Sequence, residues 1–73
     1  MTVSQKVIDV LNSTEESRAI LKTFNDRLVT EGETRPEIID KMREQAVMIA
    51  LLRNEEAQEV FAREMYHDIR NGA

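Results

Sequence analysis

The sequence predicts an all-α fold: a small bundle of three to four helices joined by short loops, forming a single domain over residues 1–73. The chain contains only two glycines and one proline, and Glu, Leu, Ile, Arg and Ala are abundant, which is typical of helical proteins. Its apolar residues recur at spacings of three and four, without a strand-like alternation of useful length. A chain this short buries only about 60% of the surface that it exposes when unfolded, so we expect a thin margin of stability.

The first expected helix covers residues 3–12, with Thr2 as N-cap and Gln5 completing a T-x-x-Q capping box. One side of this helix carries four apolar residues, Val3, Val7, Val10 and Leu11. A second helix start follows at STEE, where Ser13 or Thr14 is the expected cap and Glu16 closes an S-x-x-E box.

The second helix is expected to end near Glu31, with Gly32 as its C′ residue. Its apolar stripe consists of Ile20, Leu21, Phe24 and Leu28. The segment EGETRP then predicts a loop, because Pro36 suits the first turn of a helix and disfavours α geometry at Arg35.

A third helix is expected from Pro36, and a break or kink is expected near Arg53 and Asn54, where Asn54 precedes two glutamates as a new N-cap would. The predicted core residues of the third helix are Ile38, Met42, Ala46, Ile49 and Leu52, flanked by Ile39 and Ala50. A last helix over residues 55–70 is expected to bury Ala57, Val60, Phe61, Met65 and Ile69, and to end at Asn71 and Gly72.

The segment AVMIALL, residues 46–52, is apolar at every position and passes almost twice around a helix axis, so it cannot face one core. Sorted by angle, Val47, Met48 and Leu51 lie opposite the predicted core stripe. One interpretation is that the short first helix covers these three residues. The other is that they form an exposed patch for another protein or for self-association, for which a methionine supplies an adaptable contact.

A second candidate contact surface lies on the last helix, where Arg63, Tyr66, His67 and Arg70 share the face opposite Phe61 and Met65. Basic residues at the end of a helix and acidic residues at its start also complement the helix dipole, and this explains the same pattern without any partner. The functional interpretation is contact with a carboxylate-rich protein or with an RNA backbone, on which Tyr66 could stack.

The chain offers little to a catalytic interpretation. It has no cysteine and no Gly-rich phosphate loop, and His67 is its single histidine, so we expect no catalytic residue, no cofactor and no resident metal. Glu64 and His67 form an E-x-x-H pair, but a di-iron carboxylate site requires two such pairs and two further glutamates, which only a dimer would supply. A metal-dependent enzyme built on this pair is therefore the weakest hypothesis.

Charge and hydropathy favour a protein partner. The net charge of −4 disfavours nucleic acid and anionic membranes as primary partners, since both attract positive charge. No apolar run approaches the roughly 18 residues that span a membrane, and the N-terminus lacks signal-peptide character. We expect a cytoplasmic monomer.

The opening MTVSQKVIDVLNS, the ending FAREMYHDIRNGA, the length and the acidic helical character together resemble the small RNA-polymerase-binding transcription regulators of lytic Xanthomonas bacteriophages. The resemblance covers the whole chain but contains no transferable motif, so it assigns no residue a role. It implies a non-enzymatic protein of the host bacterial cytoplasm that binds the β′ subunit of RNA polymerase near its N-terminal end. Such a protein inhibits initiation by displacing the σ factor and promotes terminator read-through.

The alternative hypothesis is a helical homodimeric DNA-binding or antitoxin-like repressor, self-associating through AVMIALL. It requires a basic recognition helix, and no helix expected here is strongly basic.

Overall fold

The computed structural model describes residues 3–72 and contains four helices: α1 (Gln5–Ser13), α2 (Glu15–Thr30), α3 (Pro36–Leu52) and α4 (Glu55–Gly72). No strand occurs within these residues, which confirms the predicted all-α class and the short loops. The break predicted near Arg53 and Asn54 is also confirmed, because α3 ends at Leu52 and α4 begins at Glu55.

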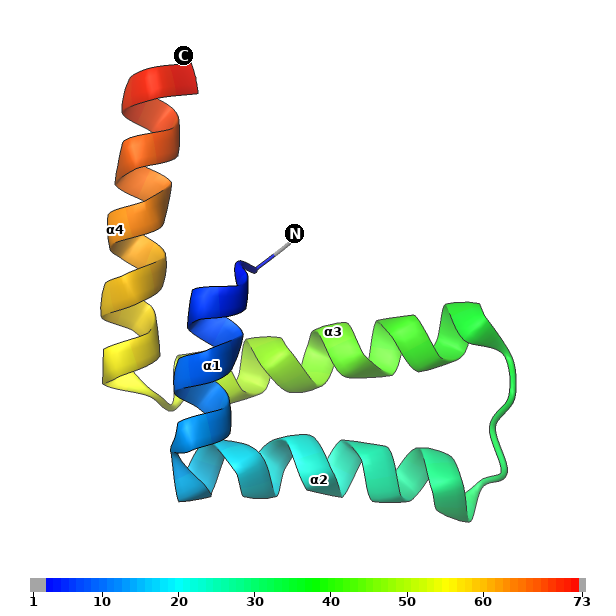
Figure 1. Ribbon diagram of the computed structural model, residues 1–73. Coiled ribbons are helices and arrows are strands. Elements are labelled where there is room, and N and C mark those ends of the chain that lie inside the picture. The colour runs from blue at the N-terminus through cyan, green and yellow to red at the C-terminus, as the bar shows by residue number, and fades with distance from the viewer. Residues whose placement is uncertain (1–2, 73) are drawn as a thin grey trace.

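The helices form two antiparallel pairs that meet at a corner (Figure 1). The long helices α2 and α3 lie side by side as one arm, while α1 lies alongside the first half of α4 in the other arm. The chain measures 43 × 26 × 15 Å, and its radius of gyration of 13.6 Å exceeds the roughly 11 Å expected for a globular chain of this length. The molecule is therefore an elongated L rather than a compact bundle.

The start of α1 differs from the prediction. The helix begins at Gln5, and Ser4 is its N-cap, with its hydroxyl accepting a hydrogen bond from the Val7 backbone N–H at 3.4 Å. Thr2, the predicted cap, lies outside the described residues. A serine and a threonine hydroxyl can each accept a hydrogen bond from a free N–H group of the first helical turn. The local sequence therefore does not decide which of the two residues is the N-cap.

The junction of α1 and α2 is at Thr14, as predicted, but the expected capping box is absent. Thr14 is the N-cap residue of α2, yet no side-chain cap hydrogen bond is made. The hydroxyls of Ser13 and Thr14 instead both donate to the Val10 carbonyl, at 2.8 and 3.0 Å. These hydroxyls therefore satisfy the end of α1 rather than the start of α2.

The end of α2 follows the predicted glycine cap. Gly32 has a φ of +65°, and its N–H donates to the Val29 carbonyl while the Glu33 N–H donates to the Leu28 carbonyl. These two hydrogen bonds form a Schellman motif, which favours glycine at the residue with positive φ. Pro36 then occupies the first turn of α3, also as predicted.

A charged clamp orders the loop between α2 and α3. The Glu33 carboxylate accepts two hydrogen bonds from the Arg35 guanidinium, at 2.9 and 3.0 Å, and two more from the backbone N–H groups of Thr34 and Arg35. These donors, the Arg35 side chain foremost, lower the pKa of Glu33 to about 2. The loop was predictable from Gly32 and Pro36, but this clamp was not.

The corner of the L contains a buried polar node centred on Asn54, which is 6% exposed. Its side-chain carbonyl accepts from the Ala57 N–H at 2.9 Å, which makes Asn54 the N-cap of α4, as predicted. Its amide donates to the hydroxyls of Thr14 and Ser17, each at 3.0 Å, and Ser17 is itself buried. One side chain thus joins the α1–α2 junction to the α3–α4 junction.

The apolar core lies at the same corner and is small. Its central cluster contains residues from α1, α3 and α4: Val7, Leu11, Ala50, Leu51 and Ala57. Leu28 of α2 and the predicted core residue Ala46 of α3 are also buried, outside this cluster. The predicted core stripe of α3 is therefore rotated at its C-terminal end, because Leu51 is 5% exposed whereas Leu52 is 72% exposed and Ile49 is also exposed. The prediction that Ile49 and Leu52 are core residues is wrong, since α1 and α4 pack on the other side of this last turn.

The outer half of α4 also departs from the prediction. Met65 and Ile69 were expected in the core, but both are exposed, while Ala57 is buried and Val60 and Phe61 are partly buried. At about 1.5 Å per residue, α1 is about 13 Å long and α4 about 27 Å, so α1 covers only half of its neighbour. The helix ends at Gly72, within the predicted Asn71–Gly72 stop, although its helical residues extend beyond Arg70.

Candidate functional site

The first predicted contact patch is largely covered by the protein itself. Leu51 belongs to the buried core with Val7 and Leu11 of α1, and Val47 packs against that core. Met48 is half-buried. This arrangement agrees with the interpretation in which the first helix covers the back of α3, and it leaves little of the patch accessible to a partner.

The second predicted surface is open to solvent, and three of its four residues lie together. The Arg70 guanidinium donates to the Tyr66 hydroxyl at 3.2 Å, and the rings of Tyr66 and His67 meet edge to face with centroids 5.9 Å apart. Arg63 is directed elsewhere, since it pairs with Glu59 at 3.4 Å one turn earlier. Glu55 and Glu56 in the first turn and Arg70 in the last also complement the dipole of α4, so both explanations of the pattern remain consistent with the geometry.

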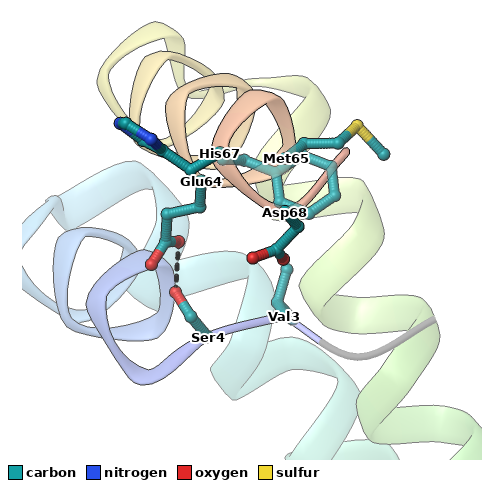
Figure 2. Close-up of a pocket in the computed structure, with 7 residues that line it drawn as sticks. Val3, Ser4, Glu64, Met65, His67 and Asp68 are labelled. Carbon is teal, nitrogen blue, oxygen red and sulfur yellow. Dashed lines mark hydrogen bonds between the residues drawn. The ribbon is translucent and has the colours of Figure 1, made fainter. Parts of the chain in front are cut away.

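A groove that the sequence analysis did not predict lies between the start of α1 and the middle of α4; we call it the α1–α4 groove. Its volume is about 600 Å³. Phe61 lines it together with the six residues labelled in Figure 2: Val3, Ser4, Glu64, Met65, His67 and Asp68.

The two carboxylates of the groove extend from α4 towards the start of α1 (Figure 2). The Ser4 hydroxyl donates a hydrogen bond to the Glu64 carboxylate. The same hydroxyl oxygen accepts the hydrogen bond from the Val7 N–H that caps α1. The Asp68 side chain extends to the same side of α4 as that of Glu64, whereas the His67 ring is turned away from the segment of residues 3–4. The groove is therefore acidic on the side where the two elements meet.

No local pattern in the sequence indicates this groove. Ser4 and Glu64 are 60 residues apart, and nothing in either segment states which turn of α4 lies beside the start of α1. The available signal was the position of Ser4 three residues before Val7, which fits an N-cap. Recognising that cap would have placed Ser4 at the helix end, although not beside Glu64.

The molecule has more surface than a compact monomer of its size. Its solvent-accessible surface is 5597 Å², whereas the scaling for monomers gives about 4,700 Å² at a mass of 8.5 kDa. Exposed apolar side chains contribute to it on three helices, with Val29 on α2, Leu52 on α3 and Met65, Tyr66 and Ile69 on α4.

The E-x-x-H pair does not form part of a larger ligand cluster. Within residues 3–72, no group of three or more His, Cys, Asp or Glu side chains is positioned to hold a metal ion. Glu64 is engaged by Ser4, and His67 is exposed beside Tyr66. Within the same residues, no helix combines the length and apolar character needed to cross a membrane.

Comparison of the chain with known protein families, with curated proteins and with solved structures found no match.

Proposed function

We propose that this chain is a non-enzymatic transcription regulator that binds bacterial RNA polymerase. In this proposal it acts as a monomer in the host bacterial cytoplasm and binds the β′ subunit. There it inhibits initiation by displacing the σ factor and promotes terminator read-through. The proposal joins the whole-chain resemblance described above to one structural observation, the excess of exposed surface on an elongated acidic scaffold.

The excess surface supports a binding role for a physical reason. A standard protein interface buries about 800 Å² per partner, and this chain exposes roughly 900 Å² more than a compact monomer of its mass. Its thin L shape would let it lie along a large partner without a major loss of internal contacts. A mechanism of this kind is steric: the regulator occupies polymerase surface that σ or the emerging RNA also needs.

The proposed contacts include the exposed surface of Tyr66, His67 and Arg70, where arginine and tyrosine are residue types that often dominate binding energy. Arg63, Val47, Met48 and Leu51 were also predicted contacts. Leu51 could contribute only if α1 moved away, because it is buried in the described structure. The acidic balance of the chain limits RNA to a secondary contact.

The test is direct binding to purified polymerase with a matched pair of variants. Labelled σ is bound to core polymerase, and the regulator is added while σ release and promoter complex formation are followed. Arg70→Gln should weaken binding about 5- to 30-fold, the effect expected of an interface arginine. Arg27→Gln, which removes another exposed arginine in the last turn of a helix, should bind like the wild type.

Absence of binding between the wild-type chain and polymerase would refute the proposal. Binding without σ release would refute the displacement mechanism while leaving the partner intact. The repressor alternative makes a separate prediction, since it requires a stable dimer. Sedimentation of a monomer at micromolar concentration would exclude it.

A further inference from the structure

The α1–α4 groove combines an apolar lining with charge of one sign. Val3, Phe61 and Met65 supply its apolar surface, and no lysine or arginine is found among the described residues that line it. Its formally charged side chains are the two carboxylates of Glu64 and Asp68, with histidine counted as neutral. A groove of this composition distinguishes among ligands by charge as well as by shape.

The carboxylates are only partly satisfied. Ser4 donates one hydrogen bond to Glu64, whereas an ionised carboxylate has two oxygens and accepts several. Asp68 makes no hydrogen bond or ion pair with any other residue between 3 and 72. It lines the groove together with the apolar side chain of Val3. A cation placed here would meet both acids and would not displace a positive charge belonging to residues 3–72.

We propose that this groove binds a short peptide segment in which an aliphatic side chain neighbours a lysine or arginine. The aliphatic group would rest against Val3 and Met65, and the cationic group would lie between Glu64 and Asp68. Met65 suits this role because its flexible thioether adapts to an incoming side chain. An acidic or phosphorylated segment would be repelled by the same two carboxylates.

This inference goes beyond the proposed function, because it concerns the chemistry of the bound segment and holds whichever protein supplies it. It adds a second contact surface, since neither Tyr66 nor Arg70 lines the groove. Ser4 belongs both to the groove and to the start of α1, because its hydroxyl caps α1 and also donates a hydrogen bond to Glu64.

The experiment is a titration of the ¹⁵N-labelled protein with two blocked tetrapeptides, acetyl-Lys-Leu-Leu-Lys-amide and acetyl-Glu-Leu-Leu-Glu-amide. We expect the basic peptide to cause saturable shifts of the backbone amides of Ser4, Met65 and Asp68. The acidic peptide should cause none. Because the probe contains no polymerase, this result and the polymerase result can fail independently.

Two matched pairs of variants test the two halves of the groove. Asp68→Asn should raise the dissociation constant of the basic peptide about two- to fivefold, as for loss of an exposed ion pair. Asp40→Asn, at an exposed position of α3, should leave this constant unchanged. Met65→Gln should raise it about threefold or more through lost apolar contact. Ile69→Gln, another exposed apolar residue of α4, should leave it unchanged.

Four outcomes would overturn the proposal. The first three are equal shifts with both peptides, an effect of Asp40→Asn equal to that of Asp68→Asn, and shifts spread over the whole surface. A fourth is a concentration-dependent shift of the groove amides without any peptide, which would assign the groove to a second copy of the chain.

Discussion

Replacing Asn54 by alanine is expected to lower the free energy of unfolding by about 3 kcal/mol, because one side chain serves both helix junctions. The substitution removes the N-cap bond to the Ala57 N–H and the two bonds to the hydroxyls of Thr14 and Ser17. Loss of an N-cap typically costs about 1 kcal/mol. Each of the other two bonds contributes about 1 kcal/mol, and Ser17, at 1% exposure, has no access to water as a replacement donor.

The effect is large relative to the whole molecule. A chain of this length is stabilised by roughly 4 to 11 kcal/mol, so the loss amounts to between a quarter and most of the total. Urea denaturation followed by far-UV circular dichroism measures it. With a slope near 1 kcal/mol per M, the midpoint should fall by about 2 to 3 M.

Two further variants separate the contributions. Asn54→Asp retains an acceptor for the cap but loses the two amide donors, so its loss should lie between those of the wild type and Asn54→Ala. Asn25→Ala, at an exposed position within α2, should be neutral or slightly stabilising, since alanine has the higher helix propensity. A loss below about 1 kcal/mol for Asn54→Ala, or equal to that of Asn25→Ala, would refute the role of the node.

Three other predictions concern the core, the α2 cap and the loop. Leu51→Ala should destabilise the protein by about 2 to 4 kcal/mol through cavity formation, whereas Leu52→Ala should change stability by less than about 0.5 kcal/mol; equal effects in urea denaturation would contradict the observed core. Gly32→Ala should cost about 1 kcal/mol because alanine is strained at a φ of +65°, and Gly32→Asn should cost less; thermal unfolding that ranks them in the reverse order would exclude the cap. The pKa of Glu33 is lowered from 4.5 to about 2, chiefly by Arg35, so the stability from this carboxylate is present above pH 4.5 and is lost as the pH falls towards 2. The melting temperature of Glu33→Gln should therefore fall less over that interval than that of the wild type, and parallel curves would contradict the clamp.

Features set by neighbours along the chain were predictable from sequence. Gly32, Pro36 and Asn54 each act within one turn of a helix end, where the requirement for positive φ, a fixed φ or a capping oxygen depends on local backbone geometry alone. These three residues mark the end of α2 and the starts of α3 and α4, whereas the junction of α1 and α2 lies at Thr14. The missed start of α1 had two adequate hydroxyl caps within three residues, so local chemistry did not choose between them.

The tertiary structure decided which face of each helix is buried and over what length of the helix it is buried. Leu51 and Leu52 are adjacent, equally apolar and both helical, and only the direction from which α1 and α4 approach makes one the core and the other solvent-exposed. Helical periodicity defines angles around an axis but contains no information on where a neighbouring helix lies along it. The same limit applies to Met65 and Ile69. They continue the apolar stripe of α4 at the correct spacing, but they are exposed because the short α1 does not cover them. It applies also to the α1–α4 groove, because a carboxylate at Glu64 becomes part of a site only where a hydroxyl from the opposite end of the chain meets it.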